Sequence, residues 1–195
     1  MARDTSPIVK QSRREGYALH PKAHKVMAKK TGIPGQHANG RQGKPSLYLT
    51  QLREKQKVRR IYGLLEKQFA KLMNEAVRTD GLAGENLLQM LEQRMDNAVY
   101  RAGFATSRRA ARQLVGHGHF MLNDRRVDIP SILVQPEEAI EPRKKEQFPE
   151  RPAKPSVTWL ELDEKSLKGK VLHLPSGVEI DTPVDISLVL QFYAR

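Results

Sequence analysis

Residues 94–126 gather the side chains best suited to binding phosphate. They include seven Arg, no Lys and two Asp. A guanidinium donates paired hydrogen bonds to a phosphate and can also stack on a base. Arg108, Arg109 and Arg112 have the spacing that places side chains on one face of a short helix, for which Ser107 is the expected N-cap. We expect no acidic partner on this helix, which favours a phosphate-binding platform over a merely solvated basic face.

A predicted β-hairpin supplies the second part of this platform. Apolar residues alternate over 120–129 around a turn at Asn123-Asp124, which is typical of two short antiparallel strands. Arg125 and Arg126 come directly after the turn. A helix followed by a hairpin would hold the guanidiniums on one rigid surface, and such a surface suits recognition of the backbone shape of a structured RNA.

A longer helix is expected to precede the platform. Its apolar pattern runs over 86–102, Asn86 can cap its first turn, and Gly103 is a natural stop. Arg94 and Arg101 lie off the apolar stripe of this helix. We therefore expect both side chains to face the same ligand as the platform.

The N-terminal third carries a separate basic region. The net charge of +12 lies wholly within residues 1–60, and the rest of the chain is neutral. Residues 1–46 are rich in Gly, Lys, Arg and Gln without apolar periodicity, so they cannot bury enough surface to fold alone. We expect an extended arm that orders on a polyanion, and nucleic acid fits better than an anionic membrane surface.

The remaining segments read as a helical domain followed by a small sheet. Helical structure begins at residue 47 with Thr50 as a candidate N-cap, and an amphipathic helix follows over 64–76. Five prolines in 136–156 predict a surface linker. Strand-like runs then cover 157–162, 170–174 and 178–180, and an apolar tail covers 184–193.

Several functional classes are excluded by what the sequence lacks. There is no Cys, which removes disulfides, cysteine nucleophiles and thiolate zinc sites. The sequence contains no phosphate-binding loop, nucleotide-binding Gly triplet or nucleophile elbow, so we predict no enzymatic activity, no cofactor and no small-molecule substrate. No apolar run approaches membrane-spanning length and no signal core is visible, so we expect a cytoplasmic protein.

Two pairs of histidines have spacings that a metal site could use. His20 and His24 are four residues apart, and His117 and His119 are two apart. Without cysteines or a nearby carboxylate cluster we interpret these residues as RNA-contacting or structural, and we predict no metal site.

The motifs of residues 94–131 resemble the RNA-binding domain named after ribosomal protein S-four. They are Arg94-Met95-Asp96-Asn97, Tyr100-Arg101, Gly103-Phe104, Ser107-Arg108, Ala111-Arg112-Gln113-Leu114-Val115, Gly118-His119 and Val127-Asp128-Ile129-Pro130-Ser131. Residues 51–68, the Pro34-Gly35-Gln36-His37 turn and the ending Phe192-Tyr193-Ala194-Arg195 resemble the bacterial ribosomal protein family itself. The resemblance covers nearly the whole chain.

The resemblance implies a function in the small ribosomal subunit. Family members bind a junction in the 5′ domain of small-subunit ribosomal RNA, nucleate subunit assembly and contribute to translational accuracy. Their partners are ribosomal RNA, ribosomal protein S-five and other small-subunit proteins, and messenger RNA near its tunnel into the subunit. Many members carry four zinc-binding cysteines in the N-terminal arm, but Val9 and Ser12 occupy the first two of those positions here. The chain would therefore be a zinc-free form whose arm is held by RNA contacts alone.

The fold expected from the residues and the resemblance is α+β, a mainly helical domain with an inserted RNA-binding domain. We assign residues 1–46 to the extended arm, 47–93 with 182–195 to the helical domain, and 94–181 to the RNA-binding domain. The apolar tail should return to pack on Leu64, Phe69 and Leu72.

The candidate RNA-binding residues are basic or polar side chains of the arm, of the first long helix and of the platform. They are Arg3, Arg13, Arg14, Lys22, Lys29, Lys30, His37, Arg41, Lys44, Arg53, Lys55, Lys57, Arg59, Arg60, Arg94, Arg101, Ser107, Arg108, Arg109, Arg112, Gln113, His117, His119, Asn123, Arg125 and Arg126.

Two other functions remain open at this point. The same small domain occurs in RNA-modifying enzymes, but those need a large catalytic domain, by resemblance, that this chain does not contain. A free RNA-binding regulator or chaperone of translation is the other alternative, although such proteins are usually shorter.

Overall fold

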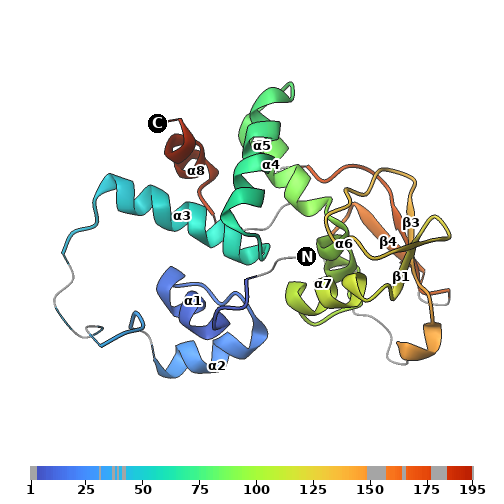
Figure 1. The fold of residues 1–195 in the computed structure, drawn as a ribbon, viewed down its shortest axis with the longest axis horizontal. Coiled ribbons are helices and arrows are strands. Elements are labelled where there is room, and N and C mark those ends of the chain that lie inside the picture. The colour runs from blue at the N-terminus through green and yellow to red at the C-terminus, as the bar shows by residue number, and fades with distance from the viewer. Residues whose placement is uncertain are drawn as a thin grey trace. The chain divides into compact units, whose positions relative to one another are not determined.

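The computed structural model describes residues 4–30, 32–36, 38, 40, 43–148, 157–163, 166–176 and 184–194. They form two compact units, Met1–Glu75 with Thr182–Arg195, and Ala76–Asp181. The first division therefore follows Glu75, whereas the sequence analysis placed it after residue 93. The predicted α+β class is confirmed, because helices α1 to α8 accompany one antiparallel sheet (Figure 1).

The bounds of the elements follow the chain. They are α1 (Ile8–Glu15), α2 (Pro21–Lys29), α3 (Leu47–Ile61), α4 (Glu66–Arg78), α5 (Ala83–Glu92), α6 (Met95–Arg101), α7 (Arg108–Gly116), β1 (Phe120–Leu122), β2 (Arg125–Val127), β3 (Ala139–Pro142), the 3-10 helix η1 (Lys145–Gln147), β4 (Leu160–Asp163), β5 (Lys168–Val171) and α8 (Ile186–Tyr193).

The expectation of an extended arm is wrong for residues 8–29, which form α1 and α2. Gly16 ends α1 in the left-handed conformation with φ of 64°, a common helix stop. Ser12 is buried in place of a cysteine, and its hydroxyl donates to the carbonyl oxygen of Ile8 at 2.8 Å and accepts from the amide of Leu19 at 3.2 Å. The arm is therefore held by internal hydrogen bonds and not by RNA contacts alone.

Helix α3 begins earlier than expected and carries the returning tail. Ser46 caps it by accepting a hydrogen bond from the amide of Leu49 at 3.2 Å, whereas Thr50 lies inside the helix. Helix α8 packs on α3, where the Gln51 side chain donates to that of Gln191 at 3.1 Å. The Tyr193 ring lies 6.1 Å from that of Phe69, which confirms the expected return of the tail onto Phe69.

The long helix expected over 86–102 is broken into α5 and α6. Arg94 has ψ of 136°, outside the helical region. The backbone on either side bonds to a later loop: the amide of Met95 donates to the carbonyl of Ile132 at 2.8 Å, and the amide of Val134 donates to that of Gln93 at 2.9 Å. These groups are unavailable to a continuous helix, so the helix ends and restarts.

Asn86 has a different function from the predicted N-cap. Helix α5 starts at Ala83, and the Asn86 side-chain amide donates to the carbonyls of Ala76, Thr79 and Asp80 at 3.0–3.3 Å. It therefore satisfies carbonyl groups at the end of α4, which otherwise lack intrahelical partners.

The five-stranded sheet has the order β2-β1-β3-β5-β4, and each neighbouring pair is antiparallel. The predicted hairpin is confirmed, with Asn123 and Asp124 at φ of 49° and 63°, as a type I′ turn requires. Strand β3 lies inside the segment expected to be linker, so that expectation is wrong for Ala139–Pro142. The expected strand over 178–180 lies outside the described residues.

Helices α6 and α7 cover the sheet through one hydrophobic core. Side chains from both helices pack with those of the strands, and Phe120, Ile140 and Trp159 are fully buried among them. This core fixes the position of α7 against the hairpin (Figure 1).

Candidate nucleic-acid interface

Asp96 binds two arginines inside the second unit. Its carboxylate accepts from Arg94 Nε at 3.1 Å and Nη2 at 2.9 Å, and from Arg112 Nη1 at 2.7 Å. The side chains of Asp96 and Arg112 are only 6% and 12% exposed. The two guanidiniums are therefore held by one buried carboxylate.

Glu92 binds a second pair of arginines in the same way. It accepts from Arg101 Nε and Nη2, both at 2.9 Å, and Arg108 Nη2 lies 3.7 Å from its Oε1. Asn97 connects the group, because its amide donates to Glu92 Oε2 at 2.7 Å and its carbonyl accepts from Arg108 Nε at 2.7 Å. The Arg108 guanidinium also stacks 4.7 Å from the Tyr100 ring.

The expectation that these arginines lack acidic partners is therefore wrong. The partners lie on α5 and α6, and the break between the two helices brings them under α7. Arg94 and Arg101 are buried at 4% and 9% exposure, against the expectation that both face a ligand. Both function here as parts of the interior, and an RNA contact by either stays a prediction.

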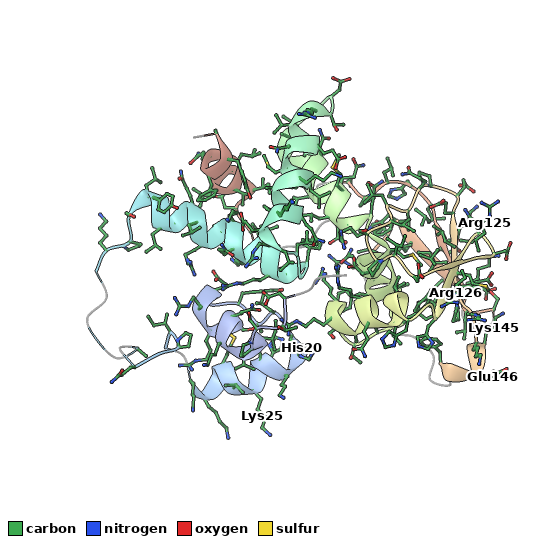
Figure 2. All side chains as sticks on the ribbon, in the orientation of Figure 1. His20, Lys25, Arg125, Arg126, Lys145 and Glu146 are labelled. Atoms are coloured by element: carbon green, nitrogen blue, oxygen red, sulfur yellow. The ribbon has the colours of Figure 1, made fainter. Side chains whose placement is uncertain are left out.

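The exposed basic surface of this unit joins the end of α7 to the hairpin. Gln113, His117, Arg125 and Arg126 are exposed, while Arg109 and His119 are half-buried. The rings of His117 and His119 lie 6.1 Å apart. Figure 2 shows Arg125 and Arg126 on the sheet part of the unit. We call these six residues the hairpin surface.

Gly118, which sequence reasoning did not select, joins the two parts of the hairpin surface. It has φ of 70°, and a Cβ built on it would lie 2.5 Å from Arg126 Nε. The Arg126 side chain thus packs directly on the backbone of Gly118. The only sequence signal was the Gly between two His after a helix stop.

Two other predicted site residues have structural contacts in this unit. Ser107 caps α7 by accepting from the amide of Ala110 at 3.3 Å, as expected. The Asn123 side chain accepts from the amide of Ala139 at 2.9 Å and donates to Glu138 at 3.2 Å. Asn123 therefore fixes the hairpin turn to β3.

Most predicted site residues of α3 are in ion pairs within the first unit. Glu15 is buried and accepts from Arg53 Nη1 at 3.2 Å and from Arg60 Nη1. Lys55 donates to Glu66 at 2.5 Å, while Arg59 and Lys57 lie 3.7 Å and 3.6 Å from carboxylates of Glu66 and Glu54. Burial raises the pKa of Glu15 above its ordinary value although Arg53 and Arg60 oppose this shift, and burial lowers the pKa of Arg60.

The remaining predicted residues lie on α1, α2 and the segment after them. Arg13 donates to the carbonyls of Gly32 and Ile33 at 3.0 and 3.3 Å. The exposed ones are Arg14, Lys22, Lys29, Lys30 and Lys44. Arg3, His37 and Arg41 lie outside the described residues.

His20 caps α2, since its Nδ1 accepts from the amide of Lys22 at 3.0 Å. Across the described ranges, no three His, Asp or Glu side chains gather as a metal site would need. Nor does any helix in that part of the chain have the length and apolar character to cross a membrane.

Comparison with known proteins agrees with this geometry. Residues 3–92 match the family profile described as "Ribosomal protein S4/S9 N-terminal domain", and residues 93–140 match "S4 domain". The chain is 44% identical over 203 residues to "Small ribosomal subunit protein uS4" of Pelodictyon phaeoclathratiforme, and both chains are covered in full. The proteins of the same name from Persephonella marina and Syntrophomonas wolfei are 45% and 44% identical, again over both full lengths. The chain, which contains no cysteine, belongs to the uS4 family of small ribosomal subunit proteins.

Proposed function

We propose that this chain is a structural constituent of the small ribosomal subunit that binds ribosomal RNA through the hairpin surface. The observation that carries the proposal is the exposed basic cluster on α7 and the hairpin, in a domain that matches the S4 profile. Relatives named as small ribosomal subunit proteins support the assignment to the ribosome, and hence to the cytoplasm. Membership of this family of structural proteins agrees with the prediction that the chain is not an enzyme.

Binding would be driven mainly by phosphate neutralisation. Arg125 and Arg126 are exposed on a hairpin whose turn is fixed by Asn123, so their backbone positions are set before RNA arrives. Each phosphate neutralised releases counterions, which strengthens binding at low salt. Arg108 and Arg112 have a second function, because their pairing with Glu92 and Asp96 fixes α7 beneath the surface.

The finer functions follow from the family resemblance. We propose that the ribosomal RNA target is the junction in the 5′ domain, that binding occurs early in subunit assembly, and that the chain contributes to translational accuracy. Contacts with ribosomal protein S-five and with messenger RNA near its tunnel are parts of the same proposal. The exposed Lys22, Lys29, Lys30 and Lys44 would add phosphate contacts from the first unit.

Co-sedimentation with small ribosomal subunits after a high-salt wash tests the assignment. We expect the intact chain to remain with the subunit fraction, because an integral constituent is held by many contacts. A chain found only in the free pool would contradict the proposal and would favour a free regulator of translation.

A further inference from the structure

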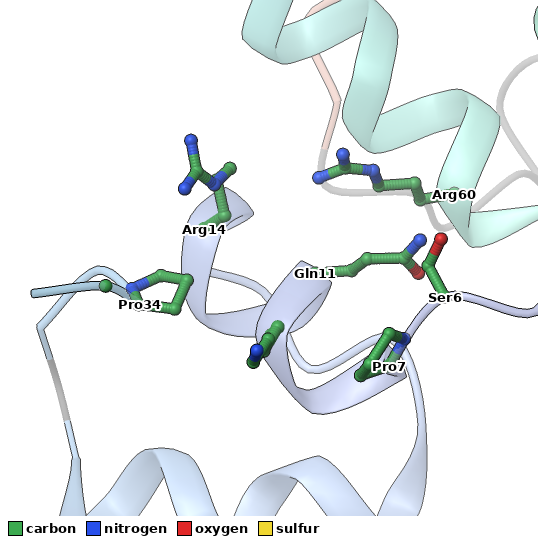
Figure 3. Close-up of a pocket in the computed structure, with 8 residues that line it drawn as sticks. Ser6, Pro7, Gln11, Arg14, Pro34 and Arg60 are labelled. Atoms are coloured by element: carbon green, nitrogen blue, oxygen red, sulfur yellow. The ribbon is translucent and has the colours of Figure 1, made fainter.

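A basic cavity lies between α1, the Pro34-Gly35 turn and α3 in the first unit (Figure 3). Its volume is about 370 Å³, and none of its eight lining residues is acidic. Lys10 and Arg14 come from α1, while Arg60 reaches from α3 toward the α1 side chains. Three cations therefore surround one opening.

The positive charge of this cavity exceeds the negative charge behind it. Glu15 accepts hydrogen bonds from both Arg53 and Arg60, so one carboxylate faces two guanidiniums. The other nearby acid, Asp4, accepts from the amide of Ser6 at 2.9 Å and from Gln11 Nε2 at 2.7 Å. These contacts leave the charges of the α1 cations uncompensated.

Lys10 and Arg14 are both exposed. Neither forms a hydrogen bond or an ion pair with any other residue for which the structure gives a position. Their donors are thus available to an anion in the cavity.

The two opposite walls of the cavity are held in place by the protein itself. Arg60 is fixed by its ion pair with the buried Glu15. Arg13 donates to the carbonyls of Gly32 and Ile33, which ties the segment before Pro34 to α1. An anion would meet a partly formed site, so less ordering would be required on binding.

We propose that this cavity binds a phosphate group of the RNA backbone through Lys10, Arg14 and Arg60. Guanidinium and ammonium groups converging without a lining carboxylate are the donors that a phosphate requires. The inference rests on the proposed function and gives the first unit its own RNA contact. Lys10 was absent from the sequence-based set, because α1 was not expected to form.

The test is the double variant Lys10→Gln/Arg14→Gln, which keeps the aliphatic stems of two exposed side chains. The control Lys67→Gln/Lys71→Gln removes the same charge from exposed positions of α4. Each intact chain is titrated with small-subunit ribosomal RNA at several salt concentrations, and circular dichroism checks its fold. We expect the cavity variant alone to bind about tenfold more weakly, with a log–log salt slope shallower by about one.

Affinity and slope equal to those of the control variant would overturn the phosphate site, while wild-type binding in the same series would leave the proposed function standing. Absence of wild-type binding would instead contradict the proposed function. A second arm follows the nitrogen NMR signal of Arg14 Nε with inorganic phosphate. If this signal responds but the RNA titrations of the two variants agree, the cavity binds free phosphate and the RNA contact is overturned.

Discussion

Arg112 Nη1 donates to Asp96 Oδ2 at 2.7 Å, although sixteen residues separate them along the chain. The same carboxylate accepts from Arg94, so one buried acid connects α7 to the break between α5 and α6. Breaking a buried pair leaves an uncompensated charge, and this costs far more than losing an exposed pair.

Asp96→Asn should therefore destabilise the second unit. We expect the free energy of unfolding to fall by about 3 kcal/mol, measured by chemical denaturation. Asp128→Asn is the matched control, because Asp128 is exposed. Equal losses in the two variants would show that the buried pair contributes nothing beyond an ordinary surface charge.

Arg125→Ala/Arg126→Ala should separate binding from stability. Both side chains are exposed, so the melting temperature should change little while affinity for small-subunit ribosomal RNA falls about tenfold or more. Lys67→Ala/Lys71→Ala removes the same charge from α4 and serves as the control in filter binding. Unchanged affinity in the hairpin variant would remove the hairpin surface from the binding account.

Gly118→Ala should disturb both the backbone and Arg126. The left-handed φ of 70° costs an alanine about 1–2 kcal/mol, and its Cβ would displace the Arg126 guanidinium. Gly116→Ala is a matched control, since Gly116 has no positive φ and its Cβ would meet open space. We expect thermal unfolding and RNA titration to change in the first variant only, and equal behaviour would contradict the packing of Arg126 on Gly118.

The ion pair beneath the C-terminal helix should make stability acid-sensitive. Burial alone would raise the pKa of Glu66, but the hydrogen bond and charge of Lys55 outweigh it, so the pKa lies below its ordinary 4.5. A lowered pKa stabilises the fold above about pH 4.5 and loses that contribution as the pH falls through the folded-state value.

Glu66→Gln should therefore lower stability by about 1 kcal/mol at neutral pH, since Glu66 is half-exposed and screened by solvent. The difference from wild type should disappear on acidification, as followed by denaturation at several pH values. Glu85→Gln, on the exposed part of α5, should show neither effect. A loss that persists unchanged below the folded-state pKa would contradict the ion-pair explanation.

Local signals were sufficient for the features that local residues determine. Ser107 caps α7, Gly116 ends it, and Asn123-Asp124 turns the hairpin, because each feature depends on neighbouring backbone groups. The partners of Arg94 and Arg112 could not be read in this way. They depend on a helix break fixed by residues 130–134, which lie far along the chain.

The N-terminal arm was misread for a similar reason. Its composition lacks a core, but Glu15 forms ion pairs with Arg53 and Arg60, which are 38 and 45 residues away. A single buried carboxylate has no periodic signature. The basic residues of α3 thus looked like a surface for RNA, although several of them bind carboxylates within the same unit.

The salt dependence of RNA binding by the intact chain tests the central claim most directly. Titration with the 5′ domain of small-subunit ribosomal RNA should give a linear fall of log affinity with log salt concentration. We expect a slope of about −4 or steeper, as neutralisation of six or more phosphates predicts. A slope near zero, or failure to bind this RNA at low salt, would contradict the claim that exposed cations of this chain bind the ribosomal RNA backbone.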